Sequence, residues 1–280
     1  MTAPVRNVWW DRLRGARSAR GARPEPDRAA AGFAFGQGWA RESESESERE
    51  PTAIAEPPRP GRLAAHFEAN AEGPGIWKWR HYFEAYERHL AKFVGRSPRV
   101  VEIGVYSGGS LEMWKQYFGS GCEIIGVDIE EACRAYAGPS VEIVIGDQAD
   151  PAFWAGFVER FDALDVVIDD GGHLPEQQIA TLEALLPRLR DGGVYICEDV
   201  TGVENEFQDY CDGLARNLNA EEWISESPAT VKPSGFQTQV HSIHRYPFLV
   251  AIERTPEPVA ELIAPRHGTE WQPFFDRPGP

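Results

Sequence analysis

The 280-residue sequence has few of the features that mark membrane, secreted or nucleic-acid-binding proteins. No apolar run approaches the roughly 20 residues that a membrane helix needs, and the N-terminus lacks the apolar core of a signal peptide. Basic residues number 28 against 44 acidic ones, and the net charge of -16 repels nucleic acid phosphates and anionic membrane surfaces. We therefore expect a protein that binds neither nucleic acid nor membrane.

Cysteine is scarce as well. The chain has four cysteines, which show no paired metal-ligand spacing and are too few for a disulfide framework: Cys122, Cys133, Cys197 and Cys211. We expect reduced thiols and a cytoplasmic location. The hydrophobic content of 42% is nevertheless enough for a substantial buried core.

The first sixty residues differ in composition from the rest of the chain. Arginines recur among small residues, and the runs RESESESERE and EPPRPGR follow them. Such polar, proline-rich sequence cannot bury enough apolar surface to offset the entropy lost on ordering. We expect residues 1–60 to be a disordered low-complexity tail and residues 61–280 to be one domain. The basic tail also resembles an organelle transit peptide superficially, or could bind a polyanion.

The remainder alternates strand-like and helix-like patterns. The stretch from Ile76 to Gly95 has helical spacing and predicts an amphipathic helix that leads into the core. Five short apolar runs then alternate with helical patterns: RVVEIGV, CEIIGVDI, VEIVIGD, LDVVIDD and GVYICED. This order indicates an α/β fold with a Rossmann-like, doubly wound, mostly parallel sheet. The final runs FQTQVHSIHRY and PFLVAIERT predict a C-terminal antiparallel hairpin, where dehydrogenases usually continue with βα units.

In such a sheet ligands bind at the carboxyl ends of the strands. After the first strand, Gly104 and Gly108 border a loop in which Val105 and Tyr106 stand where the dinucleotide fingerprint needs its second glycine. A wider loop suits a ligand without a pyrophosphate, such as S-adenosylmethionine (SAM). Asp128, after the second strand, can accept hydrogen bonds from both ribose hydroxyls of an adenosine.

Carboxylates follow each of the next three strands. Asp147 can accept from an adenine amino group or cap the next helix. Asp169 ends the fourth strand, and Asp170 lies beyond it at the mouth of the site. The fifth strand ends in the pair Glu198 and Asp199.

Three of these acids, Asp170, Glu198 and Asp199, predict a Mg²⁺ site with open positions. The alternative is that each acid caps its own helix. Against that alternative, mutual repulsion without a cation would raise their pKa values. His173 is the candidate general base, because its ordinary pKa near 6.5 suits proton transfer near neutral pH. Otherwise it is a first-turn helix residue without a contact to substrate.

The motifs VEIGVYSGGS, GVDI, GDQ, IDDGGH and CEDV, in this order, resemble the class I SAM-dependent methyltransferases. More specifically, they are similar to the metal-dependent macrolide sugar O-methyltransferases of the mycinamicin 2''-O-methyltransferase kind. The resemblance implies magnesium ligands at Asp170, Glu198 and Asp199 and a base at His173. We expect the cofactor-binding residues to be Glu102, Gly104, Ser107, Gly108, Asp128, Ile129, Asp147, Gln148 and Asp169.

The resemblance therefore predicts a Mg²⁺-dependent enzyme that methylates a sugar hydroxyl on a glycosylated small molecule, in a family that often forms homo-oligomers. Two departures bear on the acceptor. Gly172 stands where the family usually has serine, and the macrolide enzyme has an additional N-terminal domain where we expect only the low-complexity tail. A catechol-type acceptor, or a SAM-binding accessory role resembling the cephalosporin hydroxylase group, are the alternatives. The aromatic residues Trp77, Tyr82 and Tyr86 could line the acceptor site or pack in the core.

Overall fold

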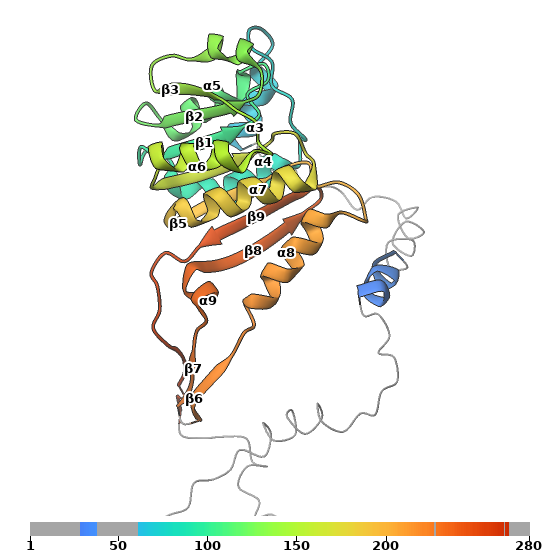
Figure 1. Ribbon diagram of the computed structural model, residues 1–280, viewed down its shortest axis with the longest axis vertical. Helices are drawn as coiled ribbons and strands as arrows, with labels where there is room; N and C mark the ends of the chain where they lie inside the picture. Colours follow the sequence, from blue (N-terminus) through green and yellow to red (C-terminus); the bar gives the residue numbers. More distant parts are fainter. Residues whose placement is uncertain (1–28, 38–60, 227, 266, 269–280) are drawn as a thin grey trace, which may run out of the picture. The chain divides into compact units, whose positions relative to one another are not determined.

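The computed structural model of the chain describes residues 29–37, 61–226, 228–265 and 267–268 (Figure 1). Residues 29–37, within the stretch predicted to be disordered, form an exposed helix. Alanine makes up four of these nine residues and is the best helix former, which accounts for the difference. The rest of the predicted tail lies outside the described residues, and the division of the chain near residue 60 stays a prediction.

The main sheet has seven strands in the order β3-β2-β1-β4-β5-β9-β8. Strands β1 to β5 pair in parallel, whereas β9 runs antiparallel to both β5 and β8. This arrangement confirms the predicted doubly wound sheet with a C-terminal hairpin. The strands are β1 (Arg99–Ile103), β2 (Glu123–Asp128), β3 (Val141–Ile145), β4 (Leu164–Asp169), β5 (Leu189–Cys197), β8 (Val240–Tyr246) and β9 (Leu249–Arg254).

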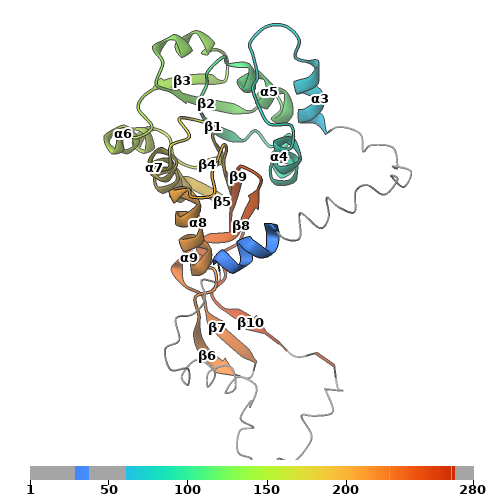
Figure 2. The same cartoon turned by 90° about the vertical axis from the view of Figure 1, so that its right-hand side faces the viewer.

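Helices cover both faces of this sheet (Figure 2). Side chains alternate along each strand, so Val100 joins the core beneath one set of helices and Val101 joins the core beneath the other. The first set is α3 (Arg62–Ala69), α4 (Tyr82–Leu90) and α5 (Gly109–Phe118). The second set is α6 (Pro151–Arg160), α7 (Pro175–Leu185) and α8 (Glu206–Asn217). Short 3₁₀ helices are η1 (Ala91–Phe93), η2 (Glu131–Tyr136) and η3 (Leu186–Arg188).

Two predicted boundaries were wrong. The helix expected from Ile76 begins only at Tyr82, and the preceding segment runs without regular structure, with Trp77 exposed and Lys78 buried. The strand expected from Phe236 begins at Val240, because Ser234 and Gln237 form a capping box that starts the short helix α9 (Gly235–Gln239).

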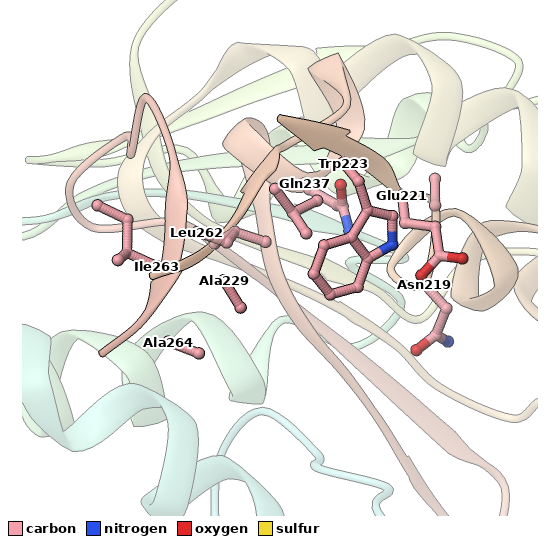
Figure 3. Close-up of a pocket in the computed structure, with 10 residues that line it drawn as sticks. Asn219, Glu221, Trp223, Ala229, Gln237, Leu262, Ile263 and Ala264 are labelled. Atoms are coloured by element: carbon pink, nitrogen blue, oxygen red, sulfur yellow. The ribbon is translucent and has the colours of Figure 1, made fainter. Parts of the chain in front are cut away.

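A second, antiparallel sheet was not predicted from the sequence. It contains β6 (Glu222–Glu226), β7 (Ala229–Lys232) and β10 (Leu262–Ala264). Trp223 and Leu262 are among the residues that border an open pocket on this sheet (Figure 3). None of the predicted site residues lines this pocket.

All four cysteines are buried and carry free thiols. Among the described residues, no helix combines the length and apolar composition needed to cross a bilayer.

Candidate active site

The carboxyl ends of β1, β4 and β5 meet because these strands are neighbours in the sheet. The amide of Asp170 donates to the carbonyl oxygen of Ile103 at 2.9 Å, and the amide of Glu198 donates to that of Asp169 at 2.8 Å. Gly104 has a φ of +88°, and a Cβ there would lie 1.9 Å from the carbonyl oxygen of Asp170. Only glycine therefore allows the first strand end to approach the fourth this closely.

Asp128 accepts hydrogen bonds from the backbone of the glycine loop, which connects β1 to α5. Its Oδ2 accepts from the amides of Val105 at 2.8 Å and Tyr106 at 3.0 Å, and its Oδ1 accepts from the amide of Glu130 at 2.9 Å. Partial burial raises the pKa of Asp128, but these backbone hydrogen bonds outweigh burial and hold it below its ordinary value. Ile129 follows with its side chain exposed. Binding of ribose by Asp128 stays a prediction, and the contacts in the structure shape the loop.

Glu102 lies beneath the same loop. Its carboxylate is fully buried and accepts from Ser110 Oγ and from Trp114 Nε1, both at 2.9 Å. Burial raises its pKa. Ser107 and Gly108 directly precede α5, and Gly108 is the N-cap of this helix with a φ of +74°. Glu102 thus anchors the start of α5 from the interior.

Asp147 follows β3, as predicted, and is exposed, but it does not cap α6. Its Oδ1 accepts from the amide of Ala149 at 2.8 Å. The N-cap of α6 is Asp150, whose Oδ1 accepts from the amide of Ala152 at 2.8 Å. Asp147 is therefore available at the strand end for a polar ligand.

Gln148 and Asp169 form a buried hydrogen-bond network with the turn that connects β4 to α7. Gln148 Nε2 donates to Asp169 Oδ1 at 2.7 Å and to Thr181 Oγ1 at 2.9 Å, while its Oε1 accepts from the amide of Gly172 at 2.9 Å. Asp169 also accepts from Tyr195 at 2.9 Å, and burial raises its pKa to about 7. Both side chains are buried, so this network holds the turn that carries the predicted base. Cofactor contacts of Gln148 and Asp169 stay predictions.

Asp170, His173 and Asp199 come together at the mouth of the site. Each offers one ligand atom, and all three atoms lie within 4.8 Å of one another. His173 Nε2 lies 3.6 Å from Asp199 Oδ2 and 4.0 Å from Asp170 Oδ1. His173 and Asp199 have φ values of +59° and +54°, which non-glycine residues rarely adopt and which are typical of functional sites. His173 precedes α7 instead of lying in its first turn.

Asp199 is oriented by residues that precede and begin α4. Its Oδ1 accepts from Trp79 Nε1 at 2.9 Å and from the Tyr82 hydroxyl at 2.8 Å. Tyr82 and Tyr86 are buried, which agrees with the core-packing alternative, whereas Trp77 is exposed. Oδ2 of Asp199 faces His173. The aromatic residues thus fix one oxygen of the carboxylate and leave the other toward the opening.

Lys78 was not predicted from the sequence. Its Nζ donates to Asp170 Oδ2 at 2.6 Å and to Glu198 Oε1 at 2.8 Å, and lies 3.9 Å from Glu102 Oε1. Burial lowers the pKa of Lys78, but the three carboxylates outweigh it and raise that pKa. The signal in the sequence was a single lysine between two tryptophans, which indicates a partly buried segment but no partner.

Residues 101–200 match a family described as a methyltransferase domain. This segment is a SAM-dependent methyltransferase domain. The chain is 35% identical over 201 residues to an 8-demethyl-8-alpha-L-rhamnosyl tetracenomycin-C 2'-O-methyltransferase of Streptomyces olivaceus, covering 65% of this chain and 52% of that protein. It is 36% identical over 128 residues to the mycinamicin VI 2''-O-methyltransferase of Micromonospora griseorubida, covering 43% and 32% of the two chains.

A solved structure agrees with these relatives. The MycE methyltransferase of the mycinamycin pathway, in complex with Mg and SAH, superposes with a TM-score of 0.59 at 25% identity, covering 70% of this chain and 55% of that one. These matches confirm the resemblance to the macrolide sugar O-methyltransferases. The chain spans about half the length of the first curated relative that it matches.

Two of the three predicted magnesium ligands, Asp170 and Asp199, offer oxygen atoms that suit a magnesium ion. Asp170 Oδ1 and Asp199 Oδ2 both face His173, and two carboxylate oxygens with open positions suit Mg²⁺. The carboxylate of Glu198 is buried, and its Oε1 accepts from Lys78 Nζ at 2.8 Å. Burial, followed by the charge of Asp170, raises the pKa of Glu198 to about 8. A ligand role for Glu198 stays a prediction.

A second group of possible metal ligands lies between α4 and the β8–β9 hairpin. His89, His244 and Glu253 also bring three ligand atoms within 4.8 Å of one another. His89 Nδ1 lies 2.5 Å from Glu253 Oε1, and its Nε2 lies 2.9 Å from the Tyr246 hydroxyl. Lys92 donates to the other oxygen of Glu253 at 3.0 Å. Because these partners occupy both His89 nitrogens, we interpret the group as a polar link between helix and hairpin.

Proposed function

We propose that this protein transfers the methyl group of SAM to a hydroxyl of a sugar on a glycosylated small molecule, with Mg²⁺ as cofactor. The observation that carries the proposal is the meeting of Asp170, His173 and Asp199 beside the glycine loop. The relatives are named as methyltransferases of a rhamnosyl tetracenomycin and of mycinamicin VI, which supports a glycosylated acceptor.

The chain's own residues have three tasks in this reaction. The sulfonium of SAM already activates the methyl group, so the site must align it with an acceptor oxygen and exclude water. Asp128 shapes the loop for the cofactor, and Asp147 offers a carboxylate toward the adenine. His173 would take the proton from the acceptor hydroxyl.

Magnesium would be held by Asp170 Oδ1 and Asp199 Oδ2, and when bound it would lower the pKa of a coordinated hydroxyl and fix its direction. Trp79 and Tyr82 keep Asp199 in the orientation that this requires. His173 Nε2 faces both carboxylates, so the base and the proposed ligands converge on one acceptor oxygen.

Exposed aromatic rings border the site and suit a flat acceptor. Trp79 and Phe248 lie with ring centroids 5.6 Å apart, and both are partly or largely exposed beside Asp199. Such rings can pack against the apolar face of a sugar. The same rings could pack against a vicinal phenol, so an activity assay with catechol must distinguish the two acceptors. The cytoplasmic location, the homo-oligomer and the absence of nucleic acid and membrane partners stay predictions.

The test is methyl transfer from labelled SAM to rhamnosyl tetracenomycin, mycinamicin VI and catechol, each with Mg²⁺ and with EDTA. We expect transfer to a glycosylated acceptor that EDTA and Asp170→Asn abolish, while S-adenosylhomocysteine still binds in calorimetry. Asp162→Asn, a substitution of an exposed acid away from the site, is the matched control and should retain activity. Transfer that survives both EDTA and Asp170→Asn contradicts the metal mechanism. Transfer to catechol alone favours the phenol acceptor, and no turnover favours the accessory role.

A further inference from the structure

A groove beside the β8–β9 hairpin contains none of the predicted site residues. Its volume is about 620 Å³, which lies within the range of about 300 to 1,000 Å³ typical of small-molecule sites. The cross-strand pair of Val240 on β8 and Arg254 on β9 lines it, together with residues from α7, α8 and α9. These three helices lie on one side of the hairpin (Figure 2). The groove is therefore a separate candidate for a binding site.

The strand register places this groove away from the mouth of the candidate active site. Strand β9 runs antiparallel to β5, and Val250 lies opposite Cys197, the last residue of β5. Arg254 is four residues farther along β9 than Val250. At about 3.3 Å per residue this is ~13 Å from the carboxyl end of β5, beyond which Asp199 lies. An occupant of the groove would therefore be distinct from the cofactor and from the acceptor.

Most of the side chains that line the groove are apolar. Leu182 comes from α7, Leu214 from α8 and Phe236 from α9. Two of the polar side chains there satisfy each other, because the Tyr210 hydroxyl donates to Oε1 of the exposed Glu183 at 2.8 Å. The lining therefore suits an occupant with an apolar body.

Arg254 is the one basic side chain among the described residues that line the groove. It is 11% exposed, and its one side-chain hydrogen bond in the described part of the chain runs from Nη2 to Asp191 Oδ1 at 3.3 Å. Its Nε is buried and has no hydrogen-bond partner there. A guanidinium carries five N–H donors, and a buried charge without partners costs free energy. Arg254 therefore has the capacity to bind a further acceptor.

We propose that this groove binds a small monoanionic ligand, a carboxylate on an aliphatic or aromatic body, with its carboxylate on Arg254. A guanidinium pairs with a carboxylate through two parallel N–H···O hydrogen bonds. One basic side chain balances one negative charge, whereas a phosphate group carries up to about two, in a groove that Glu183 also lines. The apolar walls would cover the rest of the ligand and shield the ion pair from water.

The test is calorimetry with 2-naphthoate and octanoate as the aromatic and aliphatic probes, and with 2-naphthamide and octanamide as their neutral counterparts. We expect the wild type to bind at least one carboxylate with a Kd below about 1 mM and its amide at least about tenfold more weakly. Arg254→Met should weaken binding of that carboxylate at least about tenfold and bring its affinity to within about threefold of the amide's.

A second pair of variants changes the charge of the groove at another position. Leu214→Glu and Leu214→Gln alter the same side chain on α8, but only glutamate adds a negative charge. Leu214→Glu should bind the carboxylate at least about fivefold more weakly than Leu214→Gln. Arg245→Met is the matched control, because Arg245 pairs with Asp212 and does not line the groove. Thermal unfolding shows whether each variant is folded, and the leucine pair decides the question if Arg254→Met fails to fold.

The absence of binding for both carboxylates up to about 10 mM overturns the proposal. Equal binding of carboxylate and amide overturns it too, as does an unchanged affinity in folded Arg254→Met, which places the probe elsewhere. Self-association in sedimentation that Leu214→Glu abolishes and Leu214→Gln retains assigns the groove to a second copy of the chain, and also overturns it. Because these readouts are binding and association, an absence of methyl transfer tests the proposed function alone.

Discussion

Gly104→Ala should disrupt the point where the first and fourth strands meet. Gly104 has a φ of +88°, and an added Cβ would lie 1.9 Å from the carbonyl oxygen and 2.7 Å from the carbonyl carbon of Asp170. Both atoms belong to the backbone, so no side chain can rotate to make room. The strand ends must separate, which strains the hydrogen bond from Asp170 N to Ile103 O at 2.9 Å.

The free energy of unfolding should fall by roughly 3 to 6 kcal/mol. Left-handed backbone costs an alanine about 1 to 2 kcal/mol. Forced overpacking typically adds about 1 to 3 kcal/mol, and a lost hydrogen bond about 1 kcal/mol. Because Asp170 moves with its carbonyl, S-adenosylhomocysteine and Mn²⁺ should both bind at least tenfold more weakly.

Gly73→Ala provides a matched control. Gly73 also has a φ of +88°, but an added Cβ there would meet no atom within 4 Å. It should therefore lose only the backbone contribution of about 1 to 2 kcal/mol and keep its ligand affinities. Urea unfolding followed by tryptophan fluorescence measures both variants, with m-values checked for equality. Equal losses of stability in the two variants would refute the steric reasoning.

Three further predictions follow from the hydrogen bonds described above. Trp79→Phe should lower kcat about tenfold with little change in acceptor KM, because Asp199 loses the 2.9 Å hydrogen bond from the indole but the aromatic ring remains. Trp79→Leu, which also removes the ring, should raise the acceptor KM as well. Equal KM values for both variants would contradict packing of the acceptor against this ring. Asp128→Asn should weaken S-adenosylhomocysteine binding at least tenfold in calorimetry. One carboxylate oxygen becomes an NH₂ donor, so the side chain cannot accept from the amides of Val105 and Tyr106 and from the amide of Glu130 at the same time. Unchanged affinity would contradict a role of Asp128 in shaping the loop for the cofactor. The hydrogen bond with His89 lowers the pKa of Glu253 to about 2 from its ordinary 4.5, so its ionised form stabilises the fold above pH 4.5 and loses this effect as the pH falls toward 2. Glu253→Gln should cost about 1 to 2 kcal/mol at pH 7 after allowance for partial exposure, and a cost that does not shrink in urea titrations below pH 4.5 would contradict this account.

The fold was predictable where the pattern is local. Strands β1 and β4 are short runs with β-branched residues that are almost wholly buried, and a helix follows each of them. Runs such as RVVEI and LDVVID therefore predict both a strand and its parallel pairing. The small second sheet was not predictable in this way. Its strands are three to five residues long, and β10 pairs with β7 from more than twenty residues farther along the chain.

The sequence predicts which strand ends carry the site residues, but it does not predict which atoms of those residues face one another. Topology alone brings Asp170, Glu198 and Asp199 to one edge of the sheet, and the structure places all three there. The direction of each carboxylate depends on side chains from distant segments. Gln148, for example, is buried, and its Oε1 accepts from the amide of Gly172, while its contact with the cofactor stays a prediction. No local spacing could indicate the contact between Gln148 and Gly172.

Two kinds of cation can neutralise the carboxylates at these strand ends, a metal ion and an ammonium group. Four carboxylates gathered at three strand ends require positive charge, and from the sequence a divalent ion is the economical source. Lys78 already supplies a cation to Asp170, Glu198 and Glu102, so the acidic excess alone does not distinguish an ammonium from a metal. The observations that favour magnesium are therefore the carboxylate oxygens that Lys78 does not contact. These are Asp170 Oδ1 and Asp199 Oδ2, and His173 faces both. Asp199 is therefore the strongest indication of a metal site, because Lys78 does not contact it and Trp79 and Tyr82 fix its orientation.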